Sequence, residues 1–386
     1  MQKGYLFIAN STKPTPNKAN SLQPYTIGTF GYAPVKAAND MGYKLYFGLN
    51  RDTAEQVKCT NFDIQFYNAH IYRDVFAFKD NWIAYKNLVK LLKEHPEIEV
   101  IHCNTPIGGL LGRICGHKFK KTVIYTAHGF HFYKGAPKKN WLLYYPIERF
   151  LAHWTDAIIT INDEDFEAAK KFHYKKGGKA YYIPGVGVEL ESYSIDEIER
   201  KKVREGLNLK NEDVAAIVVG DLNQNKNVET IIRAIGEAKT KIHLLICGMG
   251  PLENELKSLA VELGVDKYCH FLGFRTDIKV LYTVSDIFIN ASQREGLPRS
   301  TMEAMLAGLP CIVSSIRGNV DLIENHKGGI QFAPKDSKAL AGAINTLAVD
   351  VYKRAEYGAY NLKRIKLYDI EKVNKQMLDI YKEVCR

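Results

Sequence analysis

The sequence predicts an α/β protein with two Rossmann-like domains, for three reasons. Its 386 residues exceed the usual size of a single domain. Short apolar runs alternate with helical spacing along the chain, which is typical of parallel sheets with helices on both faces. A turn rich in proline and glycine at 184–188, followed by a highly charged stretch at 189–213, separates two such series.

The two series define the expected elements. Residues 82–92 predict an amphipathic helix because apolar side chains recur every three or four positions. A second helix is expected at 228–238, and the apolar spacing at 350–384 predicts closing helices. We place one domain at 1–190 and the other at 191–367, with ligands bound in the cleft at the carboxyl ends of the strands. The expected strands span 5–9, 44–48, 99–103, 122–126, 157–161, 180–183, 214–220, 241–247, 269–273, 286–290, 310–314 and 329–332.

Composition and charge narrow the class of protein. The chain is 46% hydrophobic and 25% charged, as globular proteins are. It has no uncharged apolar run long enough for a transmembrane helix. The seven cysteines are scattered, which predicts reduced thiols in a cytoplasmic protein. Residues 1–190 hold 25 Lys and Arg against 16 Asp and Glu, and the remainder holds 28 against 27. The basic half is expected to face an anionic partner: nucleic acid, lipid headgroups or a pyrophosphate-linked acceptor.

The stretch 294–310 carries two glutamates separated by seven residues, with a helix start between them. Glu295 lies on the loop after a predicted strand, and Glu303 lies inside the helix that ends at Gly308. Pro298 is expected in the first helical turn, where its missing N–H costs nothing. The free amides of the helix start can bind phosphate, and Glu303 can reach back to hydroxyl groups. Phosphate, ribose and sugar held together describe a nucleotide-sugar.

This stretch resembles the signature of retaining glycosyltransferases of family 4, which have the GT-B fold. The Glu-x7-Glu spacing, the strand, the Gly-Leu-Pro turn and the helix all agree, and the resemblance spans nearly the whole chain. It implies two Rossmann-like domains facing each other across a cleft, the first binding the acceptor and the second the donor. A final helix at about 368–386 would cross back to the first domain.

The resemblance also implies the donor site. The loop after the strand at 214–220 is similar to the family's diphosphate loop, with Lys226 as the cation. Asp221 stands where the family has Arg, so Arg294, Arg299 or Arg317 are open as the second phosphate cation. The turn after residue 247 matches the family's Gly-x-Gly-Pro, and the backbone after residue 273 either contacts the base or belongs to the core. The expected donor-binding residues are Gly220, Asn225, Gly248, Gly250, Phe274, Arg275, Gly296, Leu297, Pro298 and Glu303.

In the first half, His128 ends a buried strand and matches the family histidine that contacts the donor sugar. With Glu295 and Lys226 it makes up the expected catalytic set. Asn104 and Thr105 end the preceding strand, and Lys134 follows in the loop, so these three are expected on the acceptor side.

The segment 130–154 resembles a subgroup of bacterial capsular and exopolysaccharide glycosyltransferases. It is aromatic and basic, with Lys134, Lys138 and Lys139 at its head. Such a helix could rest on an anionic membrane, or it could be a core helix with an exposed cationic end.

Asp163-Glu164-Asp165 spells the Asp-x-Asp of metal-dependent glycosyltransferases. It lies just after a predicted strand, with Asn162 expected to cap a helix whose first turn holds the acids. No set of His, Asp or Glu shows metal-ligand spacing, so no metal and no cofactor are expected.

The resemblance implies an enzyme at the cytoplasmic face of the membrane. It would transfer a hexosyl or N-acetylhexosaminyl group from a nucleotide-sugar, with UDP as the expected nucleotide, to a lipid-pyrophosphate-linked saccharide of a surface polysaccharide. A nucleotide-sugar epimerase of the same fold is an alternative, although the paired glutamates speak against it. Another alternative is a non-catalytic protein that binds sugar nucleotides or anionic surfaces. No nucleic-acid motif is present, so nucleic acid is not the expected partner.

Overall fold

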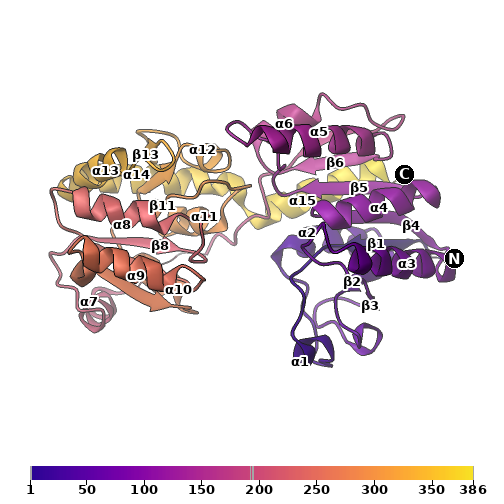
Figure 1. Ribbon diagram of the computed structural model, residues 1–386, viewed down its shortest axis with the longest axis horizontal. Helices are drawn as coiled ribbons and strands as arrows, with labels where there is room; N and C mark the ends of the chain where they lie inside the picture. Colours follow the sequence, from indigo (N-terminus) through magenta and orange to yellow (C-terminus); the bar gives the residue numbers. More distant parts are fainter. Residues whose placement is uncertain (1, 192, 194, 386) are drawn as a thin grey trace. The chain divides into compact units, whose positions relative to one another are not determined.

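The computed structural model describes residues 2–191, 193 and 195–385. The chain forms two compact units, unit 1 at Met1–Gly187 with Ile370–Arg386 and unit 2 at Val188–Asp369. Each unit contains one parallel sheet with helices packed on it (Figure 1). The predicted α/β class is therefore confirmed.

Unit 1 is built on a seven-stranded sheet in the order β3-β2-β1-β4-β5-β6-β7. All its strand pairs are parallel. The strands are β1 (Gly4–Ile8), β2 (Lys44–Leu49), β3 (Ile64–Asn68), β4 (Ile98–Asn104), β5 (Thr122–Ala127), β6 (Ala157–Thr160) and β7 (Lys179–Tyr182). The longer helices are α2 (Thr29–Asp40), α3 (Phe78–Glu94), α4 (Pro106–Lys118), α5 (Lys138–Ala152), α6 (Asp163–Ala169) and α15 (Ile370–Val384).

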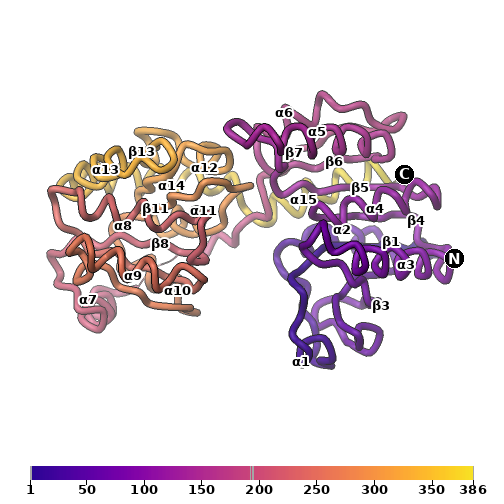
Figure 2. Tube along the Cα trace, in the orientation of Figure 1, coloured from indigo at the N-terminus to yellow at the C-terminus, as the bar shows by residue number. Residues whose placement is uncertain are grey.

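Neighbouring residues of β4 show which helices cover each face of this sheet. His102 turns to α15, where its Nδ1 meets the Tyr381 hydroxyl, and Tyr5 of β1 joins the same hydroxyl at 2.8 Å. Cys103 turns the other way, against Gly112 of α4. Helix α15 thus returns to pack on the sheet of unit 1, and the yellow trace of Figure 2 ends within that unit.

Unit 2 is built on a six-stranded parallel sheet in the order β10-β9-β8-β11-β12-β13. The strands are β8 (Ala215–Val219), β9 (His243–Cys247), β10 (Cys269–Gly273), β11 (Ile287–Asn290), β12 (Cys311–Ser314) and β13 (Gly329–Phe332). The helices are α7 (Glu197–Gly206), α8 (Val228–Glu237), α9 (Glu253–Glu262), α10 (Ile278–Thr283), α11 (Arg299–Leu306), α12 (Asn319–Leu322), α13 (Ser337–Val349) and α14 (Val351–Arg364). Apolar clusters pack on both faces of this sheet.

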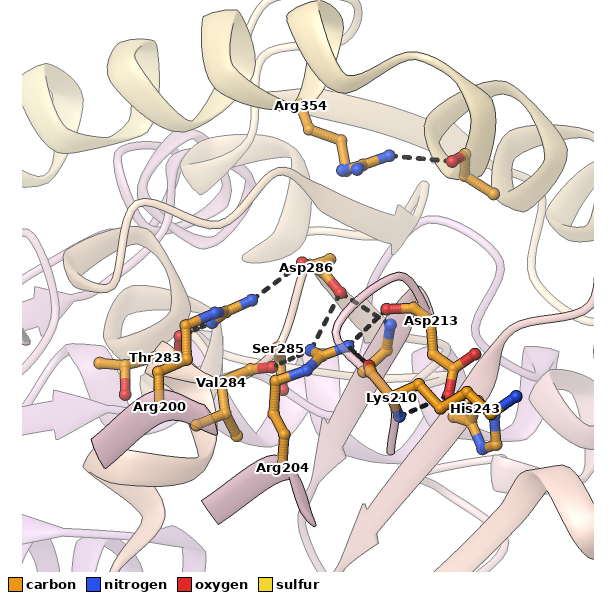
Figure 3. Close-up of polar contacts among 12 residues, drawn as sticks. Arg200, Arg204, Lys210, Asp213, His243, Thr283, Val284, Ser285, Asp286 and Arg354 are labelled. Atoms are coloured by element: carbon orange, nitrogen blue, oxygen red, sulfur yellow. Dashed lines mark hydrogen bonds and ion pairs between the residues drawn. The ribbon is translucent and has the colours of Figure 1, made fainter. Parts of the chain in front are cut away.

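The charged stretch after residue 188 folds onto unit 2 as α7. Arg204 of this helix is fully buried, and it donates to the carbonyls of Val284, Lys210 and Asp213 (Figure 3). Arg200 reaches the Asp286 carboxylate at 3.3 Å. These contacts satisfy carbonyl groups at the amino end of the sheet, opposite to the edge where ligands bind in such folds.

In the part of the chain that the structure describes, no helix combines the length and the apolar character needed to cross a lipid bilayer. All seven cysteines are free.

Candidate active site

The donor-side residues of unit 2 gather where the strand order reverses. Strands β8 and β11 are neighbours in the sheet although they are far apart in sequence, and a loop follows the carboxyl end of each. One loop carries Gly220 to Asn227 and the other carries Ala291 to Pro298. Open α/β sheets bind their ligands at such a reversal.

Hydrogen bonds fasten these two loops to each other. The Asn225 side chain donates to the carbonyl of Arg294 at 3.0 Å, and the Gln293 amide donates back to the Asn225 carbonyl at 2.8 Å. The Asn227 side chain donates to the carbonyl of Ala291. The two loops therefore form one platform. In this platform, Asn225 holds the backbone of the opposite loop by hydrogen bonds.

Lys226 and Glu295 meet across this platform, with 2.7 Å between Nζ and the carboxylate. The lysine stem lies over Gly220, where an added Cβ would come within 3.1 Å of Cε. Arg317 is buried and donates from Nε to the carbonyl of Glu295 at 3.2 Å. Two of the expected catalytic residues are thus in direct contact, and a third charged side chain fixes the loop that carries one of them.

The glycines of the platform are required by the close approach of backbones. A Cβ on Gly248 would lie 1.9 Å from the carbonyl oxygen of Gly220, and one on Gly250 would lie 2.3 Å from that of Leu222. A Cβ on Gly318 would lie 2.4 Å from the carbonyl oxygen of Gly296. The turn after residue 247 therefore packs its backbone tightly against the loop that follows β8.

Helix α11 begins at Arg299, so Pro298 is its N-cap residue and precedes the first turn that we predicted for it. Glu303 lies inside the helix and pairs with Arg299 at 2.9 Å. Leu297 packs against the apolar cluster beneath the loop. Glu303 and the loop amides therefore lie at one helix start, as the sequence pattern requires.

The loop after β10 carries the residues expected near the base. The Phe274 side chain is 74% exposed, so it is not part of the core. The Arg275 guanidinium pairs with Asp277, with 2.8 Å from Nε to the carboxylate. The contact of this loop with a base remains a prediction.

In unit 1, side chains at the carboxyl ends of three adjacent strands present polar atoms that no described residue satisfies. These are Oδ1 of Asn10 after β1, Oδ1 of Asn104 in β4, and both ring nitrogens of His128 after β5. Buried polar groups without partners are uncommon and often mark functional sites. Asn104 and His128 were expected here, whereas Asn10 was not.

Thr105 has φ of 67° and ψ of 161°, a conformation that costs a residue with a Cβ about 1–3 kcal/mol. Its Oγ1 accepts a hydrogen bond from the Asn10 amide at 3.1 Å. Such strain is maintained at ligand sites more often than elsewhere.

Burial lowers the pKa of His128 to about 4. Its ring packs edge-on against Phe30, with 5.0 Å between ring centroids. The imidazole is therefore neutral at physiological pH, and each nitrogen is able to take part in a hydrogen bond.

The acidic triplet after β6 holds the loop that follows His128. Asp165 accepts from the amide of Phe130 at 3.0 Å, and Glu164 accepts from the amide of Lys134. Asn162 caps α6, as predicted, by accepting from the Asp165 amide. The Lys134 side chain is exposed at the end of this loop. The described residues contain no group of three or more His, Cys, Asp or Glu arranged to hold a metal ion.

Each unit thus brings its own set of expected residues together: Asn104, Thr105 and His128 in unit 1, and Lys226, Glu295 and Glu303 in unit 2. Sequence reasoning did not assign Asn10 to the site, nor did it find the loop-holding role of Asp165. It also gave no role to Arg113, although a lone arginine within the apolar, glycine-rich stretch 106–116 was a visible signal.

Comparisons with known proteins agree with this geometry. Residues 199–364 match the family described as glycosyl transferases group 1, and residues 49–186 match glycosyltransferase family 4. EpsD of Bacillus subtilis (strain 168), which is named as a glycosyltransferase, is 33% identical, over 92% of this chain and 93% of its own. A second relative, from Escherichia coli, is 33% identical over 67% of this chain and 68% of its own. Its name is UDP-Gal:alpha-D-GlcNAc-diphosphoundecaprenol alpha-1,3-galactosyltransferase.

Solved structures share the fold at low sequence identity. HepE of Anabaena, solved with UDP-glucose, has a TM-score of 0.75 at 18% identity. The match covers 98% of this chain and 99% of the HepE chain. Sucrose-phosphate synthase of Thermosynechococcus elongatus has a TM-score of 0.79 at 18% identity, with 99% of both chains covered. Three findings agree: the two-unit GT-B fold, the paired glutamates on α11 and its preceding loop, and these relatives. The chain therefore belongs to the group 1 glycosyltransferases and is a glycosyltransferase.

Proposed function

We propose that this glycosyltransferase retains anomeric configuration and transfers a sugar from a UDP-sugar to a lipid-pyrophosphate-linked saccharide of a surface polysaccharide. The Escherichia coli relative is named for a UDP-galactose donor and a diphosphoundecaprenol-linked acceptor. A Campylobacter jejuni relative, 26% identical over 59% of this chain, is also named for a diphospho-undecaprenol-linked acceptor. The observation that carries the proposal is the contact of Lys226 with Glu295 beside the start of α11.

The donor diphosphate would take over Lys226 from Glu295. Lys226 and the amides after Gly296 would stabilise the negative charge that develops on the leaving diphosphate. Glu295, once released, would position the donor sugar, and Glu303 would accept hydrogen bonds from the ribose hydroxyls. Gly220, Gly248 and Gly250 would let backbone approach the nucleotide, while Phe274 and Arg275 would flank the base.

His128 would orient the donor sugar as a neutral imidazole. The sequence offers no persuasive enzyme nucleophile, so the acceptor hydroxyl would attack on the face from which the diphosphate leaves. The leaving phosphate would receive its proton. No metal enters this scheme, because Lys226 and the helix amides supply the positive charge at the diphosphate.

The acceptor would lie on unit 1, with Asn104 and Thr105 beside its sugar and Lys134 near its pyrophosphate. The surface of α5 supports a contact with the anionic membrane that holds such a lipid. Leu142 and Phe150 are 80% and 58% exposed there, and Lys138 and Lys139 begin the helix. An exposed apolar face beside lysines is typical of helices that lie on anionic bilayers. The site of action would be the cytoplasmic face of that membrane.

Donor turnover is tested by UDP release from a panel of UDP- and GDP-sugars, with and without membrane lipid extract. Glu303→Ala removes the ribose contact, and we expect it to lower kcat/KM for the donor about 10- to 100-fold. Glu262→Ala, on the exposed end of α9, removes a carboxylate outside the site and should change nothing. If wild-type protein neither binds nor turns over any nucleotide-sugar, the proposed function is wrong.

Membrane contact is tested by co-sedimentation with vesicles of phosphatidylglycerol and phosphatidylcholine. The double variant Lys138→Glu, Lys139→Glu should lose at least ten-fold in affinity, since each lysine near an anionic surface contributes about 1 kcal/mol. The matched variant Lys201→Glu, Lys202→Glu, on α7, should bind as wild type does. Equal binding by both variants would refute a membrane contact through α5.

A further inference from the structure

A small cavity opens beside His128 in unit 1, and the functional residues expected from the sequence do not account for it. Its volume is about 100 Å³. It lies between the start of α4 and the middle of α5, beside the loop that follows β5. The lining residues used below are Thr105, Tyr125, His128, His131, Tyr144 and Glu148. The cavity extends from the strand end that carries His128 to the carboxylate of Glu148.

Glu148 is 8% exposed and pairs with Arg113, with 2.6 Å from Nη1 to Oε2. Arg113 is fully buried, donates from Nε to the carbonyl of Gly109 at 2.9 Å, and stacks on Tyr125 at 4.1 Å. A buried ion pair seldom adds stability over apolar side chains of the same size. Stability of the fold therefore does not explain why a carboxylate is held at this place.

The carboxylate is suited to accept a hydrogen bond in the cavity. Its Oε2 accepts a hydrogen bond from Arg113, and an ionised carboxylate has further lone pairs that can accept others. The cavity has room for about three water molecules, which matches the hydroxyl or acetamido edge of a sugar rather than a whole ring. A phosphate would meet the negative charge of Glu148 and is disfavoured, whereas a hydroxyl or an amide N–H would be bound.

The rest of the lining favours a saccharide as well. The rings of His131 and Tyr144 lie 4.6 Å apart at one wall, and aromatic rings pack well on the apolar faces of sugars. The strained backbone of Thr105 and the unsatisfied nitrogens of His128 belong to the same lining. The cavity therefore places a fixed hydrogen-bond acceptor in the same lining as His128.

We propose that this cavity is the subsite for the acceptor sugar, and that Glu148 selects the sugar by accepting a hydrogen bond from one hydroxyl or from an acetamido N–H. Arg113 acts as a positioning residue that holds the carboxylate in place. The inference rests on the proposed function, because it assigns the sugar that receives the transferred residue. It adds the group that recognises that sugar, which the donor residues of unit 2 do not supply.

The test compares Glu148→Gln with wild type in acceptor saturation kinetics. The probe is a short-chain polyprenyl-pyrophosphate-linked N-acetylglucosamine, used with the donor that the UDP-release panel identifies. Glutamine can still accept from Arg113 but carries no charge, so we expect the acceptor KM to rise about ten-fold or more. UDP release without acceptor reports on the donor site alone and should be unchanged. Glu167→Gln, on the exposed side of α6, makes the same chemical change outside the cavity and should leave both rates unaltered.

Deoxy and N-deacetylated forms of the probe identify the group that Glu148 binds. The probe form that lacks this group should bind wild type more weakly than the complete probe does. For the Glu148→Gln protein, the two forms should differ little in affinity. If Glu148→Gln does not fold, Tyr144→Ala takes its place; it removes the ring that packs on the sugar and should raise the acceptor KM with the same unchanged donor hydrolysis. An acceptor KM equal to that of wild type in the folded variant would overturn the subsite and leave the proposed function intact. Absence of transfer by wild type to any lipid-linked acceptor would overturn both.

Discussion

The Lys226 side chain pairs with Glu295 in this structure and would pair with the donor diphosphate in the proposed reaction. A partly exposed ion pair contributes only about 1 kcal/mol, so a diphosphate could replace the Glu295 carboxylate at little cost. The pair keeps the lysine extended over Gly220 until then. Both side chains would therefore be close to their working positions before the donor binds.

Two buried histidines of unit 1 predict how its stability depends on pH. Burial lowers the pKa of His102 to about 3, with a smaller effect from His128 nearby, and lowers that of His128 to about 4. Both imidazoles have an ordinary pKa near 6.5 in the unfolded chain, so below that pH the unfolded state binds more protons than the folded one. The stabilisation is complete above pH 6.5 and is lost as the pH falls toward 4.

We therefore expect the free energy of unfolding of unit 1 to fall between pH 6.5 and pH 4.5 by about 1.4 kcal/mol per pH unit for each histidine. Urea unfolding monitored at several pH values measures this slope. His128→Phe should reduce the slope by about half, since one of the two titrating groups is removed. A slope unchanged by this variant would show that His128 does not titrate in the way its burial implies.

Pairs of residues also show how much of the site could be predicted from the sequence. Glu295 and Glu303 lie on one loop and helix, so their spacing along the chain was enough to place them together. Arg113 and Glu148 belong to different helices, 35 positions apart, and only the packing of α4 against α5 brings them into contact. Local spacing carries no information about such a pair.

At the scale of elements, the predicted strands were found, whereas strand β3 and several helices, including α2, α4, α7 and α13, were not predicted. Strand β3 is a short edge strand that holds Gln65 and ends at Asn68, so its apolar pattern is weak. Helix α4 has four glycines, which are poor helix formers, and its pattern therefore did not predict a helix. These glycines face the sheet at close range, and tertiary packing compensates for their low propensity.

The packing of α4 predicts that two glycine-to-alanine substitutions have opposite effects on stability. A Cβ on Gly116 would lie 2.2 Å from Cγ2 of Val123, whereas one on Gly342 of α13 would meet nothing within 4 Å. Gly116→Ala should destabilise unit 1 by about 1–3 kcal/mol through overpacking. Gly342→Ala should stabilise unit 2 by up to about 1 kcal/mol, because alanine favours a helix. Thermal unfolding of the two variants measures both effects, and a Gly116→Ala protein as stable as wild type would contradict the close packing.

At the scale of the whole molecule, the two units depend on the chain in different ways. Unit 2 is one continuous segment, whereas unit 1 includes α15 from beyond it. Helix α15 buries Val373, Met377, Ile380 and Tyr381. Each buried side chain of this size contributes about 1.5–3 kcal/mol, so the helix supplies an amount comparable to the total stability of a domain.

A chain shortened to end at Asp369 should therefore lose the fold of unit 1 and keep that of unit 2. Limited proteolysis followed by mass spectrometry should find rapid cleavage throughout residues 2–187 and protection of residues 195–369. Asp379→Ala, an exposed change on α15, serves as the control and should leave both units protected. Protection of residues 2–187 in the shortened chain would show that α15 is dispensable for the fold.

The overall division into two parallel-sheet units followed from the alternation of elements, because that pattern is repeated many times. The basic character of residues 1–190 also followed from the sequence. The sequence left open whether the helix at 138–152 rests on a membrane or lies in the core. The exposure of Leu142 and Phe150 in the structure excludes a fully buried helix.

The return of α15 to the first strands also sets an order of events during synthesis on the ribosome. The strands of unit 1 emerge first, but the part of their sheet that α15 covers stays exposed until the whole of unit 2 has been translated. At about 5–20 residues per second, that interval lasts roughly ten to forty seconds. Nascent chains would expose apolar surface of β1 and β4 throughout it, which is the kind of surface that chaperones bind. Unit 2 would complete its fold before the unit that precedes it in the sequence.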